Sequence, residues 1–218
     1  MPANLPPRAL GLLSVPAAVL LAFLTPVQAT AYGDGVRPWL RDLDSVHALA
    51  DRVWSTLGGS LDRYEFWGLW TVAGYLGMIA GLRSLVRLAE AASGPFRLLM
   101  VALSVAAVGD VGAYWGGGSE VVSQIFGMVE FLALPVLIGA FVWGGFVLIR
   151  RGHRPRWAGW VMLASAAAVP VSMGLTNYWP HGVLVPVSMG IAVLSIAAAF
   201  PRSTIDKERQ TENPAHER

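Results

Sequence analysis

The stretch from Leu98 to Ile149, LLMVALSVAAVGDVGAYWGGGSEVVSQIFGMVEFLALPVLIGAFVWGGFVLI, decides the structural class of this protein. Its only formally charged side chains are Asp110, Glu120 and Glu130. Ordinary soluble domains carry roughly 25% charged residues, whereas this 218-residue chain carries 14% and is 55% hydrophobic. Because apolar runs of about 20 residues cross a bilayer as helices, the sequence predicts an all-α, polytopic integral membrane protein.

Outward from this stretch, the apolar runs predict a bundle of about six transmembrane helices. They cover residues 9–29, 66–82, 98–115, 124–149, 157–175 and 182–200. We expect residues 1–201 to form a single transmembrane domain. The polar and charged residues 202–218 predict a disordered cytoplasmic tail.

The first apolar run has two interpretations. Residues 1–31 contain one arginine, Arg8, ahead of an apolar stretch, followed by small residues at which a signal peptidase cuts, Ala29 and Ala31. The run from Ala9 to Val27 exceeds the roughly 7–15 residues of a typical signal peptide core, which favours a retained helix. Both interpretations stay open at this point.

The distribution of basic residues predicts the orientation. Twelve of the 16 lysines and arginines lie before the first run, in two alternate loops and in the tail; the other four lie in segment 30–65. By the positive-inside rule, the protein lies in the plasma (inner) membrane with both termini cytoplasmic. In the external segment 30–65, apolar residues at three- and four-residue spacing predict one amphipathic helix over about 38–57.

Composition excludes several kinds of membrane chemistry. The chain has no cysteine, and its single lysine, Lys207, lies in the tail, which excludes thiolate sites and an intramembrane Schiff base. None of the four histidines lies in an apolar run, so a buried bis-histidine haem is not expected. We therefore expect no cofactor and no metal. We also expect no nucleic-acid partner, because the chain has no basic stripe with interleaved aromatic residues.

Two acids at membrane depth are the candidate catalytic residues. An Asp at the bilayer centre costs roughly 3 kcal/mol, so intramembrane acids are functional candidates by default. From the expected span ends, Asp110 and Glu130 both lie roughly 8–9 Å below the outer boundary on consecutive antiparallel helices. If they face each other they cannot comfortably both ionise, and the pair is expected to hold one proton.

Such a pair suits more than one function. A protonated acid beside an ionised partner can carry out acid–base chemistry on an apolar or amphiphilic ligand, lipid- or isoprenoid-like, as in an isomerase or cyclase. The same pair suits a small proton-coupled transporter. A third interpretation is a non-catalytic accessory or immunity protein, in which the acids bond only to Tyr114 or to free backbone groups.

Polar and aromatic residues near the same external end predict a ligand-binding rim. They are Tyr114, Trp115, Asn177, Tyr178 and Trp179. Tyr and Trp collect at membrane interfaces in any case, but Asn177 ends a proline-containing span and can hydrogen-bond an acid or a ligand oxygen. We therefore expect a polar pocket in the outer half of the membrane.

One short repeat is exact: VPVSMG occupies both 169–174 and 185–190. Pro170 and Pro186 predict kinks at comparable depth in adjacent antiparallel helices, and Pro135 adds a third. The kinks either accompany close packing through small residues or splay the helices to open a pocket. The spacings Gly77-xxx-Gly81, Gly112-xxx-Gly116 and Ala140-xxx-Gly144 allow close helix contact, within the chain or in a homodimer, and we favour contact within the chain.

Glu130 followed by Pro135 in one span, and Asn177 with Trp179 at the end of the next, resemble the sterol-isomerase-like membrane fold. In that fold, acids and an Asn/Trp pair line a lipid cavity. The intramembrane histidine of that family has no counterpart in this chain, so its activity is not carried over.

Overall fold

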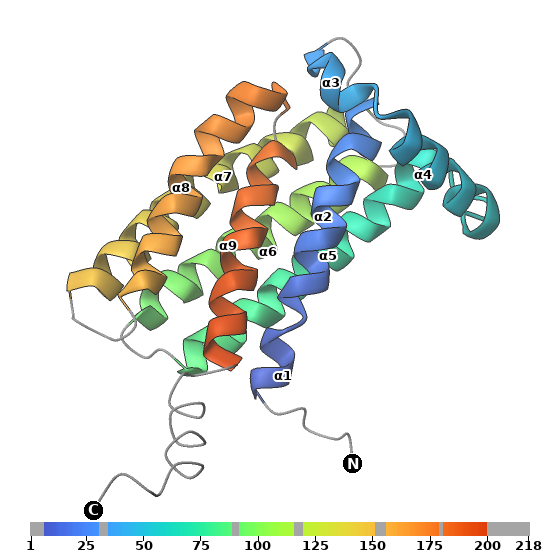
Figure 1. Cartoon of the computed structure of the whole chain (residues 1–218). Coiled ribbons are helices and arrows are strands. Elements are labelled where there is room, and N and C mark those ends of the chain that lie inside the picture. Colours follow the sequence, from blue (N-terminus) through green and yellow to red (C-terminus); the bar gives the residue numbers. More distant parts are fainter. Residues whose placement is uncertain are drawn as a thin grey trace, which may run out of the picture.

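The computed structural model describes residues 7–30, 35–88, 92–115, 120–150, 156–178 and 181–199, and these residues form helices joined by short turns (Figure 1). The helices are α1 (Pro7–Gly11), α2 (Ser14–Ala29), α3 (Pro38–Arg41), α4 (Asp44–Leu57), α5 (Arg63–Leu88), α6 (Ser93–Trp115), α7 (Glu120–Arg150), α8 (Trp157–Thr176) and α9 (His181–Ala199). The all-α expectation is confirmed. The tail at 202–218 lies outside the described residues.

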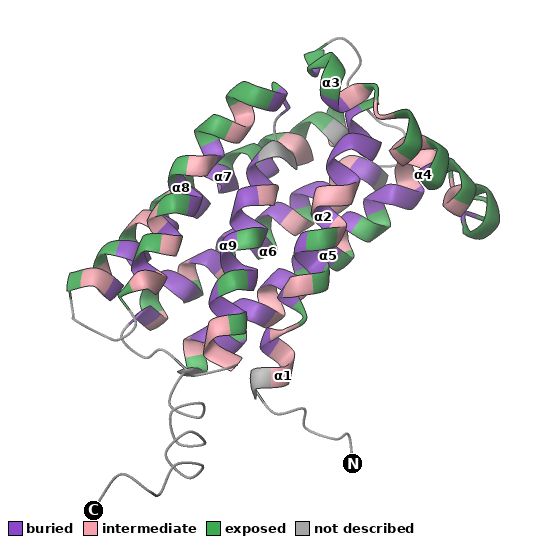
Figure 2. Cartoon of the chain, in the orientation of Figure 1, coloured by how far each residue is buried: buried purple, intermediate pink, exposed green. Residues whose placement is uncertain are grey.

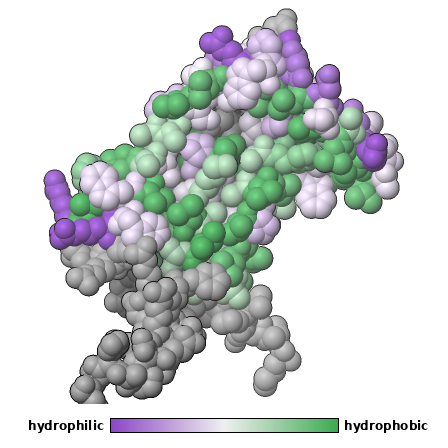
Figure 3. All heavy atoms as spheres, viewed as in Figure 1, coloured by the Kyte–Doolittle hydropathy of each residue, from purple (hydrophilic) through white to green (hydrophobic). Residues whose placement is uncertain are grey.

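Five helical segments are long and apolar enough to cross a membrane, and they lie in α1–α2 together, α5, α6, α7 and α8. The sixth expected span is α9, which contains the shorter apolar helix Val183–Ala199. Its 19 residues extend about 28 Å, close to the roughly 30 Å thickness of a bilayer core. On the face shown in Figure 3 the surface along the helices is mostly apolar, as expected for a multi-pass membrane protein.

The six long helices form a closed ring. Each of α2, α5, α6, α7, α8 and α9 packs against the next, α9 packs against α2, and α9 also contacts α5. The residues buried inside are mostly large and apolar (Figure 2). The fully buried core includes Met78, Leu99, Leu103, Leu134, Leu137 and Phe141.

The two ends of the bundle differ in what they carry. Helix α1 begins and α9 ends at one end, and α3 and α4 lie at the other (Figure 1). We call the first the arginine end, because α5 and α7 finish there with Arg87 and Arg150, and α6 begins there near Arg97. We call the second the capping end.

The single amphipathic helix expected over about 38–57 is instead two helices, α3 and α4, separated at Asp42 and Leu43. Two different contacts explain the break. Leu40 of α3 packs with Tyr178 beyond the end of α8, whereas Ala50 of α4 packs over α2 and α5. One straight helix cannot satisfy both surfaces, so the backbone leaves helical geometry at Leu43, with ψ of 74°.

The two copies of VPVSMG lie in continuous helices but have different surroundings. Pro186 of α9 is buried, whereas Pro170 of α8 is exposed. Val169, which precedes Pro170, and Val187, which follows Pro186, both belong to the common core and are 1% exposed, although they occupy different positions of the repeat. A side chain at Gly190 would collide with Ser165 of α8. These contacts favour the close-packing interpretation of the repeat, since α9 packs against α2, α5 and α8, whereas the main contacts of α8 are with α7 and α9.

Candidate functional site

Asp110 and Glu130 lie buried between α6 and α7, with 2% and 4% of their surfaces exposed. Glycine brings the two helices together at this level. A Cβ atom at Gly109 would lie 2.8 Å from both the backbone nitrogen of Glu130 and the carbonyl oxygen of Phe126. This approach next to residue 110 places Asp110 and Glu130 at the same level of α6 and α7, as expected, and their carboxyl groups interact electrostatically.

A third helix contributes Tyr75, which sequence reasoning did not identify. The Tyr75 hydroxyl donates a hydrogen bond of 3.1 Å to Oε1 of Glu130, and Tyr75 is completely buried. The signal available in the sequence was its position. Tyrosine in membrane proteins collects at the interfaces, and Tyr75 lies in the middle of α5 instead.

Asp110 is not fully satisfied by its surroundings. Its Oδ2 atom is buried and has no hydrogen-bond partner among the described residues. Most buried polar atoms in proteins are hydrogen-bonded, because burial without a partner is costly. The Oδ2 atom of Asp110 is therefore a buried polar atom whose surroundings need an explanation.

A second polar layer lies next to the first, toward the capping end. Gln28 of α2 donates from Nε2 to Oγ1 of Thr71, at 3.1 Å, and to the hydroxyl of Tyr114. Thr71 precedes Tyr75 by four residues on α5, and Tyr114 follows Asp110 by four residues on α6, so each pair shares a helix face. The two layers therefore form one polar column contributed by α2, α5, α6 and α7.

On the other side of the acid pair the buried residues are mostly apolar, and the buried polar side chains there include the serines Ser14, Ser84 and Ser195, close to the arginine end. The residues buried there, toward the arginine end, include Met78, Leu82, Leu99, Leu103 and Leu134. The polar side chains one helical turn from Tyr75 on α5 and from Asp110 on α6, Thr71 and Tyr114, lie on the side of the capping end.

The expected rim residues are distributed over two places. Tyr114 is buried in the second polar layer, where its ring contacts Tyr64 with centroids 4.4 Å apart. Asn177 is exposed, adopts a left-handed conformation (φ 49°) after α8, and donates from Nδ2 to the Gly35 carbonyl. Tyr178 is buried against Leu40.

Asn177 and Tyr178 therefore connect the end of α8 to α3 and to the residues just before it. The structure does not bring Asn177 to the acid pair. Trp179 and the side chain of Trp115 lie outside the described residues. Within the described residues, no group of three His, Cys, Asp or Glu side chains that could hold a metal ion is present.

Replacing Tyr75 with phenylalanine should measure how strongly the tyrosine supports Glu130. A hydrogen bond to an ionised group contributes about 1.5–3 kcal/mol, so Tyr75→Phe is expected to destabilise the protein by about that amount. The measurement is a double-mutant cycle in which thermal unfolding is followed for Tyr75→Phe, Glu130→Leu, which has no hydrogen-bond acceptor, and the double variant in one detergent. Additive effects would show that the hydrogen bond contributes nothing measurable.

Comparisons of the chain with protein-family models, curated proteins and solved structures found no match. Function is therefore inferred from the side chains of the site and their surroundings.

Proposed function

We propose that this multi-pass membrane protein binds and transfers a proton at the pair Asp110 and Glu130. The observation that carries the proposal is a pair of buried acids between α6 and α7, in which Oδ2 of Asp110 has no partner among the described residues and Glu130 accepts a hydrogen bond from Tyr75. Two carboxylates this close in a dry interior repel each other, so one shared proton is the stable arrangement. Tyr75 stabilises the negative charge on Glu130 while the proton resides on Asp110.

The use we propose for this proton is acid–base chemistry on an apolar or amphiphilic molecule, lipid- or isoprenoid-like. The protonated acid would donate to an alkene or carbonyl of the ligand, and the ionised acid would remove a proton from a neighbouring carbon, as in isomerisation. The net proton count is unchanged. The polar side chains Thr71, Tyr114 and Gln28 on the capping-end side of the pair support this use, because they place polar groups next to the acids on one side.

Proton-coupled transport is the second candidate, and the packing between α6 and α7 favours it. Gly109 and Gly112 hold α6 close to α7 at the level of the acids, and Gly112 lies directly against the Phe126 ring. This packing suits a site for a proton better than one for a large ligand. Transport would also require a second conformation in which the apolar core toward the arginine end opens.

Infrared spectroscopy of the purified protein tests the proposal directly. We expect a carbonyl band of a protonated carboxylic acid at neutral pH, shifted by transfer into D₂O and lost in both Asp110→Asn and Glu130→Gln. Asp44→Asn, an exposed acid on α4, is the control and should leave the band intact. A spectrum identical in all variants would overturn the proposal and leave the accessory-protein interpretation.

An assay in liposomes that contain a pH indicator distinguishes transport from catalysis. Under an imposed pH gradient, a proton-coupled transporter shows proton flux that depends on Glu130. An enzyme shows none, while the infrared band remains.

We also propose that the capping end faces the exterior and both termini face the cytoplasm, from the distribution of basic residues. The absence of native cysteine allows single-cysteine labelling without background. In intact cells, a membrane-impermeant maleimide should label Ser55→Cys in α4 and should not label Gly94→Cys at the start of α6; both positions are exposed. The opposite labelling pattern would reverse the orientation.

A further inference from the structure

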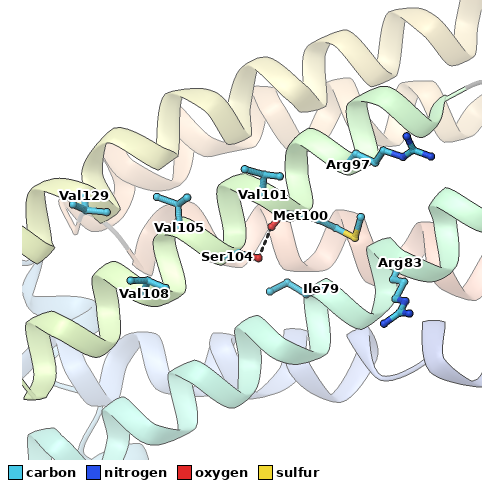
Figure 4. A pocket seen from close by; sticks show the side chains of 9 residues that line it. All are labelled: Ile79, Arg83, Arg97, Met100, Val101, Ser104, Val105, Val108 and Val129. Carbon is cyan, nitrogen blue, oxygen red and sulfur yellow. Dashed lines mark hydrogen bonds between the residues drawn. The ribbon is translucent and has the colours of Figure 1, made fainter.

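A groove of about 750 Å³ lies on the outer surface along α5 and α6 (Figure 4). Its volume falls in the range of roughly 300–1,000 Å³ that is typical of ligand sites. Except for Ser104 and two arginines, its lining is apolar. The lining residues are Ile79, Arg83, Arg97, Met100, Val101, Ser104, Val105, Val108 and Val129.

The charge of the groove is confined to one end. Arg83 of α5 and Arg97 of α6 lie at the same end of the groove, the arginine end, on two different helices, and the valines Val108 and Val129 lie at its opposite end (Figure 4). Both arginines are exposed, and no acidic residue lines the groove. Within the part of the chain that the structure describes, neither arginine forms an ion pair. Two unneutralised guanidinium groups provide a site for an anionic headgroup, because their fork geometry matches phosphate oxygens.

The length of the apolar part matches one leaflet of a bilayer. From Arg97 to Val108 the helix rises about 16 Å at 1.5 Å per residue, and half of a 30 Å hydrocarbon core is about 15 Å. Ser104 does not present a free hydroxyl to this surface, since its Oγ donates to the Met100 carbonyl at 2.8 Å (Figure 4). The groove thus combines an acyl-length apolar wall with a cationic end at headgroup level.

We propose that the groove binds one anionic glycerophospholipid from the leaflet at the arginine end. An acyl chain lies along α5 and α6, and the lipid phosphate contacts Arg83 and Arg97. The site is separate from the acid pair, because Asp110 and Glu130 face the bundle interior while the groove faces outward. At its far end the lipid contacts Val108 and Val129, so it covers the seam between α6 and α7 from outside.

Native mass spectrometry with added lipid tests this proposal. Wild-type protein in mild detergent is titrated with phosphatidylglycerol or with phosphatidylcholine of the same acyl chains. We expect one tightly bound phosphatidylglycerol, preferred over phosphatidylcholine. Loss of two surface cations should weaken that binding by roughly tenfold or more in Arg83→Gln/Arg97→Gln. The control Arg87→Gln/Arg150→Gln removes two exposed arginines outside the groove and should bind as the wild type does.

A second variant tests the apolar wall without changing charge. Val105→Trp fills the groove and should reduce binding of phosphatidylglycerol, whereas Val171→Trp on α8 replaces another exposed valine and should not. Equal lipid binding in the arginine variant and its control would overturn the proposal. A stable dimer would also overturn the proposal if Val105→Trp affected lipid binding only after the two subunits dissociate. The groove would then be occupied by a second copy of the chain.

Discussion

Glu130→Gln is expected to abolish proton exchange at the acid pair while the helical bundle stays folded. Glutamine has nearly the same size as glutamate, and its side-chain oxygen can still accept the hydrogen bond that Tyr75 donates to Glu130. It cannot take up a proton at neutral pH. General acid–base groups contribute roughly 10²–10⁴-fold to the rate of a proton-transfer step. The rate of any reaction that depends on proton transfer at the pair should therefore fall by a factor in that range.

The measurement is proton uptake after a rapid pH jump, followed with a pH indicator in weakly buffered detergent solution. The wild type minus Glu130→Gln difference should equal one proton per protein. Asp110→Asn should give the same difference, because the two acids share that proton. Asp44→Asn is the control. It should keep the proton uptake of the acid pair and lose only the titration of its own exposed carboxyl group.

Unchanged proton uptake in both interior variants would contradict the proposed site. Circular dichroism of each variant separates that outcome from unfolding. A variant that keeps its helical signal and loses the exchange supports the site, whereas Glu130→Gln with a full wild-type exchange removes it.

Gly109→Ala is expected to destabilise the protein by about 1–3 kcal/mol, the usual cost of overpacking an interior. The added Cβ would lie 2.8 Å from two backbone atoms of α7, the nitrogen of Glu130 and the carbonyl oxygen of Phe126. Backbone atoms of a helix cannot rotate away as a flexible side chain can, so α6 and α7 must separate. The acid pair would separate with them.

Gly139→Ala is the matched control, since it places the same methyl group on α7 where nothing lies within 4 Å. Alanine is favoured over glycine inside a helix by about 0.5–1 kcal/mol, so this variant should be neutral or slightly stabilised. Thermal unfolding of both variants in the same detergent gives the comparison. Equal midpoints would show that the α6–α7 contact is looser than the structure indicates.

The membrane class followed from the sequence because it depends on composition and length alone. Runs near 20 apolar residues have few stable forms other than a transmembrane helix, and the predicted spans agree with the helices to within a few residues at most ends. The depth of Asp110 and Glu130 was likewise predictable from counting along each run. Both steps use only distance along the chain.

The side of each helix that contacts the bundle interior was not predictable, because these helices are apolar on all sides. In a soluble bundle a polar stripe shows which side is exposed, but lipid and protein interior both accept apolar side chains. The sequence therefore could not indicate that Tyr75 of α5 reaches Glu130 of α7, or that Gln28 and Thr71 belong to the same column. For the same reason, the sequence predicted that Asn177 lies near the acids. The position of each residue along its helix was predictable, but the direction in which its side chain points was not.

The repeat shows the same division most clearly. Identical residues at 169–174 and 185–190 gave no sign of different surroundings, whereas in the structure Pro186 is buried and Pro170 is exposed. By itself the sequence determined that this chain forms apolar helices and at what depth two acids lie along them. Only the tertiary structure decided which helix faces meet, because in a membrane that choice depends on close packing at small residues such as Gly109 rather than on a difference in hydrophobicity.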